Sequence, residues 1–533
     1  MPASKNKLFL TITIISLLVV AFLAIVPIII RSKIDHLVKE KVPRLEYEAL
    51  NVSLLRSEIN FREIKGGYDL PGNSSSIEGT IASITFGELS WIKLLKNVID
   101  IGKIRITRPD LVIWKSDSSL EESGTKKMGA DKERSIHIGD LQFEEASLNI
   151  LDSGDSLSLL SIDTMNCLFR DIRPGKSNFQ WKDLLHNFEF DLQCLYTYDT
   201  KRLHNISINS ISGNSHDSLL TISQFNMVPG ISDLDFMHKI EKQTHRMFVS
   251  IPAINIYQIA FIELPSRKLR CGEISIPFLE LSAFLDKNKS KKDHAVKKLP
   301  QNALAKMDFS VDVDSMTLEN GYFKYSELIP GRKNPGEVSF EKTKMVIHHL
   351  TNDSLRIKEV KSTDLFVKSE LYGDGPIRLQ MQVPLSKSPW TYYLQGQLTG
   401  FALPAANQII EPSFSMFFRD GYVSELSFQA TANPIETTGN ISFFYRDLDI
   451  DFQDSKFGKR ILDNIVEAFV FPQENVKTKK HNLGKIYCKR DQSKSIFNYL
   501  WLAVFSGIQS TILPNIILPR ELKHTRVDPE GKN

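Results

Sequence analysis

Two pairs of acidic residues have the spacing that could place neighbouring carboxylates around a cation. Asp312 and Asp314 are two positions apart, as are Asp449 and Asp451. Residues two positions apart in a strand point to the same face, so each pair offers oxygen ligands of the kind that Ca²⁺ prefers. Both pairs stand in strictly alternating segments, whose polar face is ordinarily hydrated. We therefore interpret them as wet strand faces and predict no metal site.

Histidine and cysteine residues form no catalytic or metal-binding set either. His348 and His349 are adjacent, and adjacent residues of a strand point to opposite faces, so one metal ion could not bind both. The cysteines lie far apart and have no CxxC spacing. They are Cys167, Cys194, Cys271 and Cys488. We predict four small, buried or half-buried thiols.

Other features exclude whole classes of function. The motifs GxxxxGK[ST], GxGxxG, GxSxG and HExxH are all missing, so we predict neither enzyme activity nor a cofactor. The 533 residues include 66 Lys and Arg against 63 Asp and Glu, a net charge of +3. Nucleic-acid-binding proteins usually carry a larger, clustered basic excess, so nucleic acid is not a predicted partner.

The elements that position these residues are mostly strands. Apolar and polar residues alternate in many short segments bounded by Gly, Asn, Asp and Ser, which predicts an antiparallel β architecture. The clearest such segments are 101–106, 188–194, 307–314, 377–383 and 448–452. Helical periodicity occurs in only a few places, at 91–98, 459–469 and 495–512. The predicted fold class is therefore mainly β, with a long quasi-repeating sheet and few short helices.

The segment from Leu8 to Ile30 is an uncharged run of 23 residues. That is long enough to cross a bilayer and too long for the core of a cleaved signal peptide, so we predict an uncleaved signal anchor. A short amphipathic helix, broken at Pro43, is expected at 33–50. Positive charges flank both ends of the run and leave its orientation open.

The two halves of the chain share a pattern. Each has a helical turn, then a strand that ends in a proline (Pro109 or Pro277) and another apolar stretch, and then a polar stretch, at 115–134 or 286–298. A new alternating hairpin follows each polar stretch, so we predict a duplication. The predicted parts are an anchor at 1–32, a juxtamembrane helix at 33–50, β modules at 51–200 and 201–400, C-terminal strands at 401–490, and a C-terminal amphipathic helix and tail at 491–533.

The order of these pieces resembles the AsmA-like proteins of Gram-negative bacteria. The phrase I-x-I-x-x-I-x-I-x-x-P-x-L-x-I is typical of that family, and here it runs from Ile99 to Ile113. The late segment Gly439 to Leu448, which contains Y-x-D-L, and the closing segment Lys489 to Gly507 are also similar. The resemblance covers about residues 5–515, and the order of its degenerate motifs carries more weight than any one of them.

The resemblance implies a single-pass inner-membrane protein whose bulk lies in the periplasm. The AsmA-like family is similar to bridge-like lipid-transfer proteins, in which a β-sheet curls into a trough that holds phospholipid acyl chains. The implied role is outer-membrane lipid homeostasis. The alternative is a non-transporting scaffold that binds outer-membrane or periplasmic proteins during outer-membrane protein assembly.

Alternation itself identifies the residues that would line such a groove, because a sheet with one wet face must cover its other face. The same residues would be ordinary core if the sheet folded on itself. The predicted lining residues are Ile104, Ile106, Leu148, Ile150, Phe188, Phe190, Leu192, Ile274, Ile276, Phe309, Val311, Val313, Leu379 and Met381.

Overall fold

The computed structural model is mainly β, and its hydrogen-bonding pattern assigns all twenty described strands to one sheet. The structure describes residues 3–69, 75–95, 98–115, 136–154, 156–173, 184–199, 202–232, 235–236, 239–290, 296–297, 299–385, 391–414, 416–452 and 471–529. The chain divides into two compact units. Unit 1 comprises 1–198 and 207–222, and unit 2 comprises 199–206 and 223–533.

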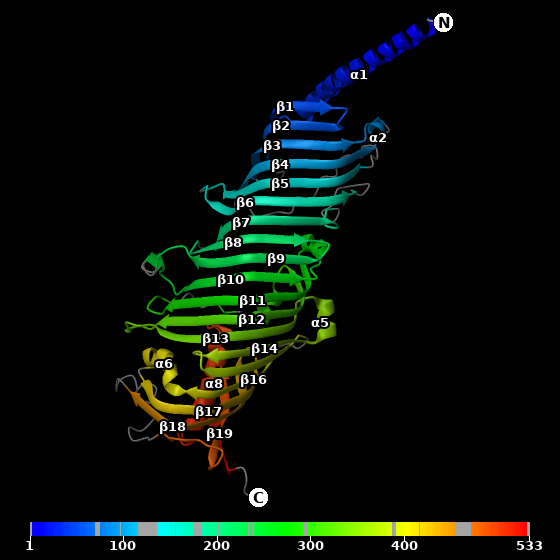
Figure 1. Cartoon of the computed structure of the whole chain (residues 1–533). Helices are drawn as coiled ribbons and strands as arrows, with labels where there is room; N and C mark the ends of the chain where they lie inside the picture. Colours follow the sequence, from blue (N-terminus) through cyan, green and yellow to red (C-terminus); the bar gives the residue numbers. More distant parts are fainter. Residues whose placement is uncertain are drawn as a thin grey trace. The chain divides into compact units, whose positions relative to one another are not determined.

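Unit 1 begins with the helix α1 (Ala3–Lys41) and continues as strands that each pair with the next (Figure 1). The strands are β1 (Leu45–Ser53), β2 (Glu58–Asp69), β3 (Ser76–Leu89), β4 (Ile99–Lys115), β5 (Ile136–Asp152), β6 (Ser158–Ile172) and β7 (Phe188–Tyr198). The short helix α2 (Trp91–Leu95) connects β3 to β4. The strands β8 (His204–Asn214) and β9 (Leu219–Pro229) are divided between the two units.

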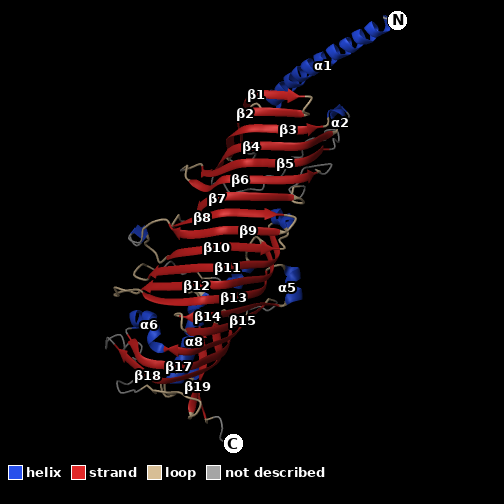
Figure 2. Ribbon diagram, in the orientation of Figure 1, coloured by secondary structure: helices blue, strands red, loops and turns tan. Residues whose placement is uncertain are grey.

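Unit 2 contains the remaining strands and most of the short helices (Figure 2). Its strands are β10 (His245–Tyr257), β11 (Lys268–Asp286), β12 (Ser310–Leu328), β13 (Gly336–Thr351), β14 (Ser362–Leu371), β15 (Gly375–Pro384), β16 (Tyr392–Ala402), β17 (Met416–Ala432), β18 (Glu436–Phe452), β19 (His481–Lys489) and β20 (Thr525–Val527). Its helices are η2 (Phe261–Ser266), α4 (Pro300–Ala305), α5 (Ser354–Val360), η3 (Leu403–Ala406), α6 (Asn407–Phe414), α8 (Ile496–Ile512) and η4 (Arg520–Leu522).

Most of the described strand pairs are antiparallel, and each unit has a parallel pair among its described strands. In unit 1, β3 leads through α2 into β4, which runs parallel to β5, and β6 follows antiparallel to β5. In unit 2, β10 leads through η2 into β11, which runs parallel to β12, and β13 follows antiparallel to β12. A duplicated module would produce this repeated order of elements. The predicted module boundaries themselves stay predictions.

The juxtamembrane prediction at 33–50 is wrong in its second half. The helix α1 ends at Lys41, and residues 45–53 form β1. Pairing with β2 places Leu50 opposite Phe61, and Leu50 is only 1% exposed. Burial in the sheet thus outweighs the local helical pattern, as tertiary packing often does.

Phe309 does not belong to a strand, although the alternation from Met307 predicts one there. β12 begins at Ser310. The side-chain amide of Asn352 donates to the carbonyl of Phe309 at 3.0 Å, and its oxygen accepts from the backbone of Val311 at 2.7 Å. These bonds occupy backbone groups that a longer strand would pair within the sheet.

Among the residues that the structure describes, no helix is long and apolar enough to cross a membrane. The structure does not describe most side chains of the predicted membrane span 8–30. Within this span it describes only the side chains of Val20 and of residues 23–30. The helix predicted at 459–469 also lies outside the described residues. The helices predicted at 91–98 and 495–512 are confirmed as α2 and α8, the former as far as Leu95.

Candidate functional site

One face of unit 1 consists of apolar side chains in register from strand to strand. Directly opposed residues share a face of the sheet, so the strand register identifies rows of side chains that cross the sheet. The most central row runs from β1 to β7 through Leu50, Phe61, Ile84, Ile106, Phe143, Cys167 and Phe190. Every side chain in this row is apolar or a thiol.

Parallel rows extend this face on both sides. The next row contains Val52, Ile59, Phe86, Ile104, Leu141, Phe169 and Phe188. Other rows contain Leu148 beside Ile162, Ile150 beside Leu160, and Leu192 beside Met165. All seven predicted lining residues of unit 1 therefore belong to rows of apolar side chains. We call this surface, on β1–β7, the unit 1 apolar face.

Bulges keep this face apolar where simple alternation would fail. Glu63, Arg108, Glu145 and Cys194 have positive φ angles of 48°, 47°, 51° and 54°. A bulge inserts one extra residue and reverses the facing of the rest of the strand. Accordingly, the apolar residues on either side of each bulge are three positions apart, as in Phe143 and Ala146. The side chain of Asn166 accepts a hydrogen bond from the backbone of Glu145 at 2.9 Å.

The unit 1 apolar face is only partly covered. Near β1, Ile34 and Val38 of α1 pack against the cluster of Leu50, Phe61 and Ile64. Ile106, Phe143 and Phe190 are half-buried in the sheet. Apart from the neighbouring strands, no described helix or sheet packs extensively over the apolar side of β4–β7. Single-layer sheets leave such a face accessible to a ligand or partner.

The opposite face of unit 1 is polar and charged. Arg105 pairs with Glu144 at 3.3 Å, and Arg170 pairs with Glu189 at 2.7 Å. His137 bridges Asp100 at 2.7 Å and Asp171 at 3.1 Å. Lys93 and His137 hold the pKa of Asp100 below its ordinary value, and Arg173 and His137 do the same for Asp171. These neighbouring opposite charges are typical of a solvated sheet face.

Unit 2 has apolar rows of the same kind. One joins Ile256, Ile274, Met316, Ile347, Leu365, Met381, Leu394, Ala430, Gly439 and Ile486. The next joins Ile276, Leu318, Met345, Val367, Leu379, Gly396, Phe428, Ile441 and Gly484. These rows contain the predicted lining residues Ile274, Ile276, Leu379 and Met381.

The C-terminal end of these rows is a closed core rather than an open face. Tyr499 and Ala503 of α8 are 2% and 3% exposed and pack in one cluster with Leu394, Ile441 and Ile486. The hydroxyl groups of Ser506 and Ser510 accept hydrogen bonds from the backbone of β19 at 3.3 and 2.7 Å. Val311 and Val313, predicted as lining residues, are also buried, at 8% and 1% exposure.

Three of the four residues of the acidic pairs, Asp312, Asp314 and Asp451, form ion pairs. The guanidinium of Arg356 contacts Asp312 at 3.6 Å and Asp314 at 2.5 Å, and Arg270 lies 3.9 Å from Asp312. Asp451 pairs with Arg419. Within the described part of the chain, no group of three His, Cys, Asp or Glu residues is placed to hold a metal ion. His349 departs from simple alternation, because its φ is 57°.

All four cysteines are free thiols. Cys271 is buried and the other three are half-buried, as the sequence predicts. Burial raises the pKa of Cys167 and of Cys271 to about 11. A thiol with so high a pKa is a poor nucleophile at neutral pH, so Cys167 acts as an apolar member of its row.

Neither a scan of protein-family models nor a search of curated proteins finds a match to this chain.

Proposed function

We propose that this chain is an AsmA-like protein that binds phospholipid acyl chains on the unit 1 apolar face and lets them move along it. The observation that carries the proposal is the set of apolar rows across β1–β7, in which many side chains of β4–β7 are half-buried although no described helix covers them. Two predicted lining residues of this face, Ile104 and Phe188, are instead buried, at 9% and 4% exposure. The residues that we propose to contact lipid are the half-buried members of the predicted lining residues on this face. Ile106, Leu148, Ile150, Phe190 and Leu192 belong to it.

The physical benefit to the lipid is large. At about 0.8 kcal/mol per CH₂ group, exposure of a 16-carbon chain to water costs roughly 13 kcal/mol. A continuous row of apolar side chains removes most of this barrier without an input of chemical energy. The polar face on the opposite side keeps the sheet hydrated. Neither a catalytic residue nor a cofactor is required.

The helix α1 supplies the point at which a lipid would enter from the bilayer. Val20, Ile25 and Ile28 are 63%, 54% and 66% exposed, as expected for side chains that face lipid tails. Farther along, Ile34 and Val38 pack on the beginning of the unit 1 apolar face. A lipid that leaves the bilayer beside α1 would next meet Ile84 and Ile106. In this proposal α1 anchors the chain in the inner membrane and the sheet lies in the periplasm.

Photocrosslinking tests the proposal directly. The full chain in nanodiscs is loaded with a phospholipid that carries a diazirine on one acyl chain, and the adducts are located by mass spectrometry. We expect adducts on Ile106, Phe143 and Cys167 and none on the polar face. Phe143→Asp should reduce labelling several-fold, because a charge on an apolar path is costly to desolvate. The matched control, Gln142→Asp, changes the neighbouring residue on the polar face and should leave labelling unchanged.

Two outcomes contradict lipid binding. One is a purified chain that carries no phospholipid by native mass spectrometry. The other is equal labelling of the Phe143→Asp and Gln142→Asp variants. Either result favours the alternative, a membrane-anchored scaffold for outer-membrane protein assembly, in which the apolar face binds a protein partner.

A further inference from the structure

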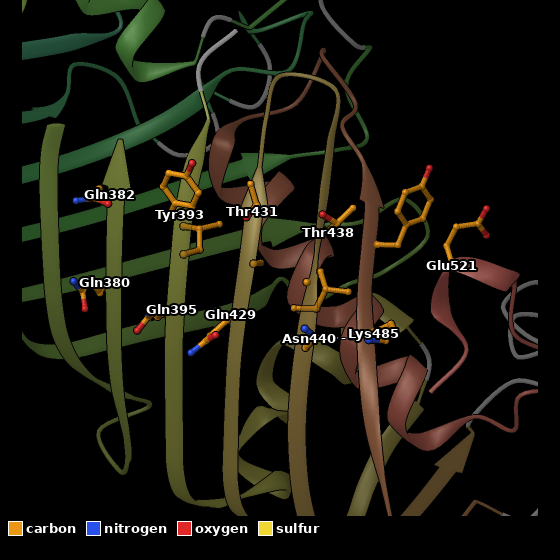
Figure 3. Close-up of a pocket in the computed structure, with 15 residues that line it drawn as sticks. Gln380, Gln382, Tyr393, Gln395, Gln429, Thr431, Thr438, Asn440, Lys485 and Glu521 are labelled. Carbon is orange, nitrogen blue, oxygen red and sulfur yellow. Dashed lines mark hydrogen bonds between the residues drawn. The ribbon is translucent and has the colours of Figure 1, made fainter. Parts of the chain in front are cut away.

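A row of uncharged amide side chains crosses the polar face of unit 2, opposite α8. It comprises Gln380 on β15, Gln395 on β16, Gln429 on β17 and Asn440 on β18, and it ends at Lys485 on β19. Each member is directly opposite the next in the strand register. In Figure 3 these side chains project from the same side of neighbouring strands. We call these five residues the amide row.

A second row runs beside the first and provides rings and hydroxyl groups. It comprises Gln382, Tyr393, Thr431, Thr438 and Tyr487. Both rows line one hollow of about 760 Å³, and Glu521 lies at its edge (Figure 3). An adjoining hollow of about 580 Å³ shares Gln380, Gln395, Gln429 and Asn440. The polar face is therefore hollowed along the amide row.

The first three amides of the row have unused hydrogen-bonding groups. No described residue forms a hydrogen bond with the side chain of Gln380, Gln395 or Gln429, and all three side chains are exposed. Only the end of the row is paired, where Lys485 Nζ donates to Asn440 Oδ1 at 2.7 Å. On the polar face of unit 1, by contrast, cross-strand ion pairs such as Arg170 with Glu189 satisfy the side chains.

We propose that the amide row binds an extended, uncharged glycan chain. A side-chain amide both donates and accepts hydrogen bonds, which matches the neighbouring hydroxyl groups of a sugar. Strands lie about 4.8 Å apart, close to the length of one pyranose residue, so successive strands would present one amide to each sugar. Tyr393 and Tyr487 add ring surface beside the amides. Nucleic acid fits poorly, because the row has one cation and no phosphate-binding cluster.

Binding of a soluble β-1,4-linked N-acetylglucosamine hexamer to the full chain tests the proposal. We expect saturable binding by isothermal titration calorimetry, and NMR saturation transfer to the sugar protons. The double variant Gln395→Ala/Gln429→Ala should bind about tenfold to a hundredfold more weakly, since it removes two amides that each form hydrogen bonds with the glycan. The matched control Gln142→Ala alters a polar-face amide of unit 1 and should bind as the unmodified chain does. A cellulose hexamer tests whether the acetamido group is needed.

The proposal is overturned if neither hexamer binds at millimolar concentration, or if the double variant binds as tightly as the control. A charged oligosaccharide that binds while both neutral hexamers fail would also overturn it. Circular dichroism of the double variant serves as the folding control, and photolipid labelling of unit 1 should be unchanged, because the exposed amides are not part of that face. Loss of glycan binding with labelling intact separates this site from the proposed lipid function.

Discussion

The unit 1 apolar face and the C-terminal core of unit 2 are built from the same pattern but have different environments. In both, apolar side chains stand opposite one another across successive strands. Ile106 and Phe143 remain half-buried, whereas Leu394 and Ile441 are 3% and 2% exposed because α8 packs on their face. Alternation thus specifies an apolar surface, and the presence or absence of a covering layer decides whether that surface becomes closed core or stays partly exposed.

The largest expected effect comes from placing the same charge on both surfaces. Leu394→Asp should lower the free energy of unfolding by about 4 kcal/mol or more, because the carboxylate would be buried without a partner. Phe143→Asp should lower it by about 1–2 kcal/mol, since that site is half-buried. Urea denaturation monitored by circular dichroism measures both. Equal losses would abolish the distinction between the two surfaces.

A bulkier residue on the buried side of α8 should partly expose the apolar side chains that this helix now covers. A Cβ at Gly507 would lie 2.8 Å from Ile441 and 2.9 Å from Ile486. Gly507→Val should therefore loosen the helix from β18 and β19, with a loss of about 1–3 kcal/mol. Binding of a hydrophobic dye should increase. Ile508→Val, which shortens a neighbouring side chain of α8 by one methylene group, serves as the control and should bind little additional dye.

Substitutions at a bulge of the unit 1 apolar face should have a smaller effect on the free energy of unfolding, and its sign should depend on the residue introduced. Glu145 has a φ of 51°, where glycine is unstrained and β-branched residues are disfavoured. Glu145→Gly should raise the free energy of unfolding by up to about 1 kcal/mol, and Glu145→Val should lower it by a similar amount. The neighbouring Glu144 has an ordinary strand conformation, so Glu144→Gly should destabilise. Urea denaturation of these three variants and of the unmodified chain measures the changes, and a loss of stability in Glu145→Gly would contradict the prediction.

The smallest predicted effect is a response of unit 1 to acid. The pKa of Asp100 is lowered by Lys93 and His137, and that of Asp171 by Arg173 and His137. A lowered carboxyl pKa stabilises the fold above the unfolded-state value and loses that contribution as pH falls through the folded-state value. The protection factors for amide hydrogen exchange in β4–β6, taken relative to the intrinsic exchange rates at each pH, should therefore fall below about pH 4. The double variant Asp100→Asn/Asp171→Asn should show a weaker pH dependence.

Sequence reasoning finds the strands and much of the apolar face, because alternation is a local signal. Phe188, Phe190 and Leu192 lie in apolar rows as expected. It places Phe309 wrongly, because the side chain of the distant Asn352 holds that backbone outside the sheet. It also misses the bulges, although pairs such as Phe61 and Ile64 carry a signal, an apolar spacing of three within an alternating segment.

The cover over the face is harder to predict from sequence than the face itself. The helical period of 495–512 predicts α8, but its buried side is made of small and polar residues such as Ser506 and Ser510. Those hydroxyl groups bond to the backbone of β19, a contact that no apolar pattern reports. The same helix leaves Phe497 80% exposed. Its most apolar side chains are therefore a poor guide to which side packs.

The two parallel pairs have a consequence for the order in which the chain folds. In the hairpins of each unit, contacting residues are close in sequence, and such contacts form quickly because little chain entropy is lost. In the parallel pairs the partners are distant, as with Ile99 and Ile136 or Lys268 and Ser310. Each such pair requires the closure of a long loop before any hydrogen bond forms. Assembly of each unit should thus slow at its parallel pair. In unit 2 it should slow again where β18 pairs with β19, because the nearest opposed residues there, Ser442 and Leu483, are also far apart in sequence.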